Sequence, residues 1–181
     1  MDNNEVLLAV LKAGDIFGEM ALLESKPRMA SAIAYEDCAV LAVNRNNFTQ
    51  MISTQPQMIA RLTTMLSERI WFIYKQLANT LIDDPLGRMY DALQIQLERN
   101  RIALDTNTSY TFDFGPKELA NMVGLTSQDA RLSLRKILEN KKIQIDNDKI
   151  YVSNILEIVK QSEYYRKMEK IEKARRGSKT S

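Results

Sequence analysis

The sequence predicts an α+β protein in which short strands around a glycine-rich turn come first, one long helix follows, and a unit of helices and strands comes last. Three observations predict this order. Gly14 and Gly18 interrupt an apolar segment near the N-terminus, an apolar stripe with helical spacing runs over residues 56–81, and two short helical patterns separated by Gly124 precede two alternating segments.

Composition and charge exclude several classes of protein. The chain has 181 residues, of which 45% are hydrophobic, with four prolines and six glycines, which is typical of a folded, helix-rich protein. No apolar run approaches the roughly 18 residues of a membrane span, and the first residues are acidic and polar, unlike a secretion signal. We therefore expect a cytoplasmic protein without a membrane partner.

The residues that usually carry catalysis or hold metals are rare. The chain has one cysteine, Cys38, and no histidine, and it contains no phosphate-loop motif. We therefore expect no metal site and no enzymatic activity. Cys38 enters an alternating apolar segment and is expected to be a buried structural thiol rather than a redox sensor.

The net charge of +2 is weak and divides unevenly. Residues 1–82 carry 7 basic and 8 acidic groups, whereas residues 83–181 carry 18 and 15. Any contact with nucleic acid must therefore come from local basic patches.

The first element is an anion-binding turn around Gly14 and Gly18. The two glycines allow tight backbone turns, Glu19 can accept hydrogen bonds from sugar hydroxyls, and Arg28 can pair with a phosphate. A plain structural turn remains an equal alternative for this motif alone. Residues 5–12 and 30–43 are rich in Val, Ile, Ala and Leu, which predicts short β-strands on either side of the turn.

Helical periodicity begins after this region. Phe48, Met51 and Ile52 mark a short helix, and Pro56 opens a helix of about 26 residues, roughly 39 Å long. Its apolar stripe consists of Ile59, Leu62, Leu66, Ile70, Ile73, Leu77 and Leu81. A stripe of this length favours pairing with a second copy of the chain, and packing on its own domain is the alternative.

The acidic segment Asp83-Asp84-Pro85 is the expected domain boundary, because proline and preceding acids mark the start of a helix. The helix that follows is predicted from an inward stripe of Leu86, Met89, Tyr90, Leu93 and Leu97, and it ends at residues 99–101. A polar loop then leads to an alternating strand over residues 110–114.

Two further helices are predicted around Gly124. The first covers residues 116–123 and stops at Gly124 in a left-handed cap, and the second begins at a capping box from Thr126 to Asp129 and runs through Leu138. Two helices joined by a glycine-containing turn are typical of the DNA-binding helix-turn-helix. The second helix combines outward Ser127, Gln128, Arg131, Arg135 and Lys136 with inward Ala130, Leu134, Ile137 and Leu138. A merely solvated amphipathic face is the alternative.

A hairpin and a basic tail complete the chain. Residues 143–145 and 149–152 alternate around an Asp-Asn-Asp turn, which indicates the wing of a winged helix. One more helix is expected from Ile155. The tail over residues 160–181 holds eight basic and three acidic groups, which predicts a frayed terminus or, alternatively, a contact with the DNA backbone.

This order of parts resembles the bacterial cyclic-AMP receptor protein / FNR family of transcription regulators. The resemblance begins at Gly18-Glu19-Met20-Ala21-Leu22 and Arg28, which are similar to the family's phosphate-binding cassette, and it covers residues 5 to about 153. It implies a partial cyclic-nucleotide-binding β-roll over 1–48, a dimerisation helix region over 49–82, a winged helix-turn-helix over 83–153, and a C-terminal helix with a basic tail over 154–181.

The resemblance also implies a function and its residues. The chain would be a homodimeric regulator that binds double-stranded DNA under the control of a cyclic nucleotide, cyclic AMP most of all, and RNA polymerase is a further possible partner. Ligand-binding residues would be Gly18, Glu19, Met20, Ala21, Arg28, Met29, Ala30 and Tyr74. DNA-binding residues would be Lys117, Thr126, Ser127, Gln128, Arg131, Arg135 and Lys136.

Some positions depart from the family's pattern. Only about a dozen residues precede Gly14, so either the first part of the β-roll is missing or the start is atypical. Ile73 and Tyr74 stand where members that respond to cyclic AMP place small hydroxyl residues against adenine. Two alternatives therefore stay open, which are a DNA-binding regulator of the same fold without a ligand, and a nucleotide-binding module that does not bind DNA.

Overall fold

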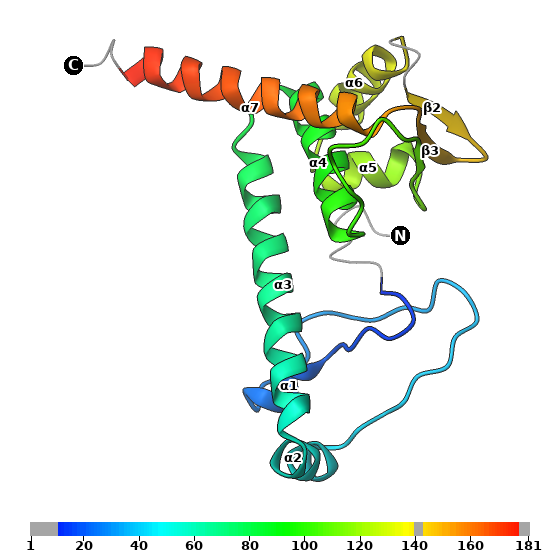
Figure 1. Ribbon diagram of the computed structural model, residues 1–181, viewed down its shortest axis with the longest axis vertical. Helices are drawn as coiled ribbons and strands as arrows, with labels where there is room; N and C mark the ends of the chain where they lie inside the picture. Colours follow the sequence, from blue (N-terminus) through cyan, green and yellow to red (C-terminus); the bar gives the residue numbers. More distant parts are fainter. Residues whose placement is uncertain (1–10, 140–142, 178–181) are drawn as a thin grey trace. The chain divides into compact units, whose positions relative to one another are not determined.

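A computed structural model describes residues 11–139 and 143–177, and the described chain divides into two compact units (Figure 1). Among the described residues, the first unit runs from Leu11 to Glu68, and the second consists of the residues from Arg69 onward. Helix α3 (Pro56–Thr80) contributes to both units as one continuous helix. The division into four segments remains a prediction.

The described regular structure of the first unit is helical. It contains α1 (Glu19–Leu23), α2 (Arg45–Thr54) and the first turns of α3. Asn44 begins α2 by accepting a hydrogen bond from the Asn47 backbone N–H at 2.9 Å, and Phe48 is the buried side chain of α2. The predicted helices after Arg45 are therefore confirmed, and α3 has 25 residues.

The prediction of a strand over residues 30–43 is wrong, because these residues form no strand in the structure. A strand needs a neighbour for its backbone N–H and C=O groups, and no paired strand occurs among the described residues of this unit. The alternating apolar residues accordingly face water, with Leu41 91% exposed. The strand expected over residues 5–12 lies outside the described residues, except that Leu11 and Lys12 are not in a strand.

Cys38 lies in the same extended segment and is exposed. The expectation of a buried structural thiol is therefore wrong. It failed because it depended on a strand whose inner face would have covered the side chain.

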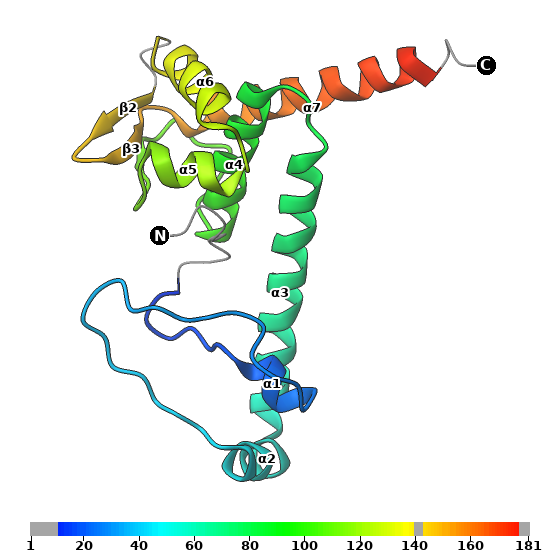
Figure 2. The ribbon, with the colours of Figure 1, turned by 180° about the vertical axis from the view of Figure 1, so that it is seen from behind.

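The second unit contains the remaining helices and a small antiparallel sheet, so the α+β class is confirmed. The elements are α4 (Pro85–Arg99), β1 (Tyr110–Thr111), α5 (Pro116–Met122), α6 (Ser127–Glu139), β2 (Ile143–Asp146), β3 (Lys149–Val152) and α7 (Ile155–Gly177). Figure 2 shows the β2–β3 hairpin beside α5 and α6. The sheet has the order β1-β3-β2, with Tyr110 opposite Val152 in one pair and Ile143 opposite Val152 in the other.

The strand predicted over residues 110–114 is shorter in the structure, because β1 has only two residues. Its pairing nevertheless continues, since the Phe112 N–H donates to the Ile150 carbonyl at 2.8 Å and the Ile150 N–H donates to the Phe114 carbonyl at 3.1 Å. Phe112 is thereby held in the core, where it is fully buried.

One hydrophobic core joins the helices and strands from α4 to α7. Asp84 caps α4 by accepting from the backbone N–H of Leu86 at 2.8 Å, with Pro85 in the first turn, as predicted. Helix α7 lies so close to α4 that a Cβ atom on Gly87 would come within 2.8 Å of the Tyr165 side chain. The core includes Met89, Leu93 and Leu97 of α4, Leu119 of α5, Ile137 of α6, Val152 of β3 and Ile158 of α7.

A buried carboxylate links three helices of the second unit. Asp91 of α4 is 0% exposed and accepts from Asn79 of α3 at 2.9 Å and from Ser162 of α7 at 3.1 Å. Arg166 of α7 forms an ion pair with the same carboxylate. Each carboxylate oxygen of Asp91 therefore accepts a hydrogen bond, and the end of α3 is tied to α4 and α7.

The prediction of a frayed tail is also wrong for the described residues, because α7 continues as a helix to Gly177 (Figure 1). Its second half contacts the segment between α3 and α4. The Lys173 ammonium donates to the Leu81 carbonyl at 2.7 Å, and the Asp83 N–H donates to the Glu169 carboxylate at 2.9 Å. Residues 178–181 lie outside the described residues.

Candidate functional site

The glycine-rich turn forms two left-handed backbone positions in the first unit. Gly14 has φ 89° and Gly18 has φ 74°, in the region that favours glycine. The Lys12 N–H donates to the Asp15 carboxylate at 2.8 Å, which fixes the first turn, and α1 begins directly after Gly18. The predicted role of the two glycines as turn residues is confirmed.

Arg28 lies against Gly18. A Cβ atom on Gly18 would come 1.3 Å from the Nη1 atom of Arg28, so the guanidinium occupies the space that any other side chain at position 18 would take. Glu19, the next residue, is 3% exposed. The structure therefore brings Arg28 against Gly18, the neighbour of the buried Glu19, although Arg28 and Glu19 are nine positions apart in the sequence.

Arg45 supports the cassette that Gly18, Glu19 and Arg28 form, and sequence reasoning missed it. Its guanidinium donates to the Ser25 hydroxyl at 2.6 Å and to the Ala21 carbonyl at 3.2 Å. These bonds join the start of α2 to the middle of α1 and to Ser25 after it. No pattern in the sequence indicated these contacts, because Arg45 is 20 positions from Ser25 and 24 positions from Ala21.

The other predicted ligand residues differ in their surroundings. Met20 is exposed and Ala21 is half-buried, whereas Met29 and Ala30 lie exposed in the extended segment. Tyr74 belongs to the second unit, where it lies exposed on α3. Gly18, Glu19 and Arg28 are therefore the predicted ligand residues that the structure brings together.

The second candidate site is the helix pair α5–α6. Gly124 follows α5 with φ 60°, and Thr126 caps α6 by accepting from the Asp129 N–H at 3.2 Å. The Thr126 hydroxyl also donates to the Asp129 carboxylate at 2.7 Å. The cap and the left-handed stop are both as predicted, so α5 and α6 form a helix-turn-helix, with the β2–β3 hairpin as its wing (Figure 2).

The exposed face of α6 is polar and basic. Ala130, Ser133 and Ile137 are buried on the inner face. Arg135 forms an exposed ion pair with Glu139 at 3.3 Å, and such a pair contributes little stability and leaves the guanidinium able to exchange partners. The side chain of Ser127 lies outside the described side chains. The other predicted DNA-binding residues are all exposed, and they are Lys117, Thr126, Gln128, Arg131, Arg135 and Lys136.

Sequence reasoning missed one further residue of this face. Leu132 is 54% exposed, whereas Leu134, two positions later, packs against the core. Helical periodicity is the signal that could have found it, because positions 130, 133, 134 and 137 supply the inner face and leave position 132 outside it.

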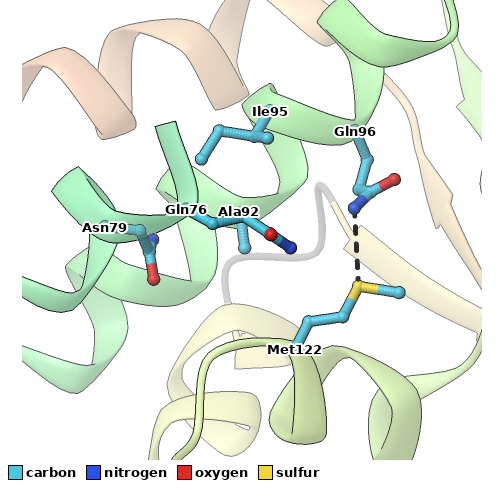
Figure 3. Close-up of a pocket in the computed structure, with 6 residues that line it drawn as sticks. All are labelled: Gln76, Asn79, Ala92, Ile95, Gln96 and Met122. Atoms are coloured by element: carbon cyan, nitrogen blue, oxygen red, sulfur yellow. Dashed lines mark hydrogen bonds between the residues drawn. The ribbon is translucent and has the colours of Figure 1, made fainter. Parts of the chain in front are cut away.

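A small pocket of the second unit is not a ligand site. It is lined by Gln76, Asn79, Ala92, Ile95, Gln96 and Met122, and the Gln96 amide donates to the Met122 sulfur at 3.6 Å (Figure 3). Its free volume of about 10 Å³ is close to the minimum for one water molecule. Ligand pockets for drug-sized molecules measure roughly 300–1,000 Å³, so a nucleotide does not fit here.

Two further kinds of feature are absent from the described residues. None of their helices is long and apolar enough to cross a membrane. Within the same residues, no group of three or more Cys, Asp or Glu side chains could hold a metal ion.

Known proteins are similar to the N-terminal part of the chain and to most of its length. A family model described as a cyclic nucleotide-binding domain matches residues 1–55. The chain is 22% identical to a CRP-like cAMP-activated global transcriptional regulator of Mycobacterium tuberculosis over 153 residues, which are 84% of this chain and 68% of that protein. It is 27% identical to a cyclic AMP receptor protein of Thermus thermophilus over 151 residues, covering 80% of this chain and 64% of that protein.

A solved structure is also similar. It is the crystal structure of a CRP/FNR-family transcriptional regulator of Thermus thermophilus, with a TM-score of 0.48 and 19% identity. The likeness covers 60% of this chain and 56% of that chain.

Proposed function

We propose that the chain is a homodimeric, sequence-specific DNA-binding regulator of the CRP/FNR family, controlled by a cyclic nucleotide, as its similarity to a cyclic nucleotide-binding domain model and to cAMP-activated regulators supports. The observation that carries the proposal is the exposed polar face of α6 on a capped helix-turn-helix. A cytoplasmic location and the absence of catalysis belong to the same proposal, and contact with RNA polymerase remains a prediction.

In the proposed complex, α6 enters the major groove and its side chains divide into two roles. Gln128 lies in the first turn of α6 and has the amide geometry that pairs bidentately with adenine. Arg131 and Arg135 suit guanine or phosphate, whereas Lys117 and Lys136 suit phosphate. Thr126 and Ser127 stand at the start of α6, where hydroxyls and backbone N–H groups bind phosphate.

The exposed stripe of α3 supports the homodimer. Ile70, Ile73 and Leu77 are each more than half exposed, although they repeat at steps of three and four residues along one face. The opposite face is occupied within the chain, because Lys75 pairs with Glu98 of α4 at 3.1 Å and Asn79 binds Asp91. A second copy of the same helix is the partner that a long apolar stripe favours.

The cassette supports a cyclic nucleotide as the effector. The Arg28 guanidinium would pair with the cyclic phosphate, and the Glu19 carboxylate would accept a hydrogen bond from the ribose hydroxyl. Gly18 permits this arrangement because it leaves space for the guanidinium. Cyclic AMP is the proposed member of this class, since the relatives' names specify it. The proposed ligand set is completed by Met20, Ala21, Met29, Ala30 and Tyr74.

One observation favours a second candidate function, which is DNA binding without an effector. Residues 29–41 are exposed and form no strand in the structure, so they do not enclose a nucleobase. In this case, affinity for DNA would not depend on a nucleotide.

We expect Gln128→Ala to relax sequence preference and Lys136→Ala to weaken binding to all sequences alike. A bidentate pair discriminates against the wrong base by roughly 1–3 kcal/mol, whereas a phosphate contact is independent of sequence. Fluorescence anisotropy with a duplex selected from a random library, and with point variants of that duplex, measures both effects over a salt series.

Lys136→Ala should also reduce the slope of log affinity against log salt by about one, because one phosphate contact is lost. The matched control is Lys160→Ala, which removes an exposed lysine of α7. An equal loss of affinity on every duplex for Gln128→Ala would contradict its assignment as a base-reading residue, and binding that is indifferent to salt would contradict DNA binding through this face.

A further inference from the structure

Leu132 is an apolar side chain at the centre of the polar face of α6. It is 54% exposed and does not belong to the hydrophobic core cluster of the unit. Gln128 lies one helical turn before it and Lys136 one turn after it, with Arg131 and Arg135 on the same face. Leu132 therefore projects from the surface that carries the proposed DNA contacts.

The fold does not require a leucine at this position. Ala130 and Ile137 are buried, Leu134 packs against the core, and these residues already anchor α6. Among the described residues from 112 to 152, only Leu132 and Ile145 are exposed large apolar side chains, and Ile145 belongs to the hairpin. The exposed leucine is thus the one large apolar side chain that the described surface of α6 presents.

We infer that Leu132 reads the C5-methyl group of a thymine in the major groove. This inference rests on the proposed DNA-binding function. The thymine methyl is the apolar feature that base pairs present in that groove, and an apolar side chain is its chemical complement. Gln128 suits adenine and Arg135 suits guanine, so Leu132 adds a thymine to the sequence that α6 selects.

Replacement of thymine by uracil tests the contact, because uracil lacks only the methyl group. The full chain is first used to select a duplex from a randomised library in the presence of cyclic AMP. Each thymine of one half-site is then replaced by uracil, and dissociation constants are measured by fluorescence anisotropy. For the unmodified chain, one replacement should weaken binding about fourfold, which corresponds to the loss of one buried methyl group.

Two variants connect this effect to the side chain. Leu132→Ala should bind the thymine and uracil duplexes equally, and Leu132→Met should keep the preference for thymine because it keeps an apolar side chain. Ile145→Ala, which removes the other exposed apolar residue of the region, should keep the preference as well. Circular dichroism confirms folding, which is expected to be unchanged because Leu132 is exposed.

The outcomes separate this inference from the proposed function. If the chain selects a sequence but no uracil replacement weakens binding, or if Leu132→Ala keeps the thymine preference at the same position, the inference is overturned and the proposed function stands. If the chain selects no duplex and binds none, both are overturned.

Discussion

Replacing Asp91 with alanine is expected to lower the free energy of unfolding of the second unit by about 3–5 kcal/mol. The Asp91 carboxylate is 0% exposed and accepts from Asn79, Ser162 and Arg166. Alanine leaves these donors without their acceptor, and the Arg166 charge loses its partner. Urea denaturation followed by far-UV circular dichroism measures the change.

The matched control is Glu139→Ala, which breaks an exposed ion pair with Arg135. Exposed pairs are worth about 0–1 kcal/mol, so this variant should unfold at nearly the same urea concentration as the unmodified chain. A loss below about 1 kcal/mol for Asp91→Ala would mean that the three helices do not depend on this carboxylate.

The substitution Leu77→Asp is expected to dissociate the homodimer and to weaken operator binding about 100-fold or more. Leu77 is 58% exposed in the single chain, so aspartate costs the folded protomer little. In a paired seam, however, it would bury two like charges opposite each other. Loss of the second subunit removes the avidity that two half-sites provide, which is typically 10²–10⁴-fold. Analytical ultracentrifugation and fluorescence anisotropy measure the two effects.

Ala78→Asp is the matched control, because it introduces the same charge at the next position of α3, outside the apolar stripe. It should remain dimeric and bind DNA. A Leu77→Asp variant that stays dimeric would contradict pairing through this stripe.

The second unit could be predicted closely because local signals coincide there. The Asp-Asn-Asp turn between alternating segments produced the β2–β3 hairpin, with Asn147 and Asp148 in left-handed conformation at φ 47° and 60°. The cap at Thr126 and the stop at Gly124 likewise fixed α5 and α6. Each of these elements is specified by residues within a few positions of its ends.

The errors occurred where long-range contacts decide the structure. Residues 30–43 have strand-like composition, but composition does not supply the neighbouring strand that pairing requires. The basic tail has the composition of a frayed terminus, yet the bonds of Lys173 to Leu81 and of Arg176 to Asp83 join residues about ninety positions apart. Pairs such as Glu169–Lys173 within α7 were the local signal that could have indicated the longer helix.

The candidate sites could be predicted only in part, because local spacing indicated some of their residues whereas other contacts depend on the fold. The spacing of Glu19 and Arg28 indicated the cassette, but the contact of Arg28 with Gly18 depends on how the intervening turn folds. Arg45 and Leu132 could not be found from a motif, because one supports the cassette from another helix and the other departs from the polar pattern of its face.

The most direct test of the account is the affinity of the chain for its selected duplex with and without saturating cyclic AMP. We expect cyclic AMP to increase affinity about tenfold or more, in the range of typical allosteric coupling, and we expect Arg28→Gln to remove this increase while retaining the basal affinity. Equal affinity with and without the nucleotide would contradict control by a cyclic nucleotide and would favour the regulator without an effector.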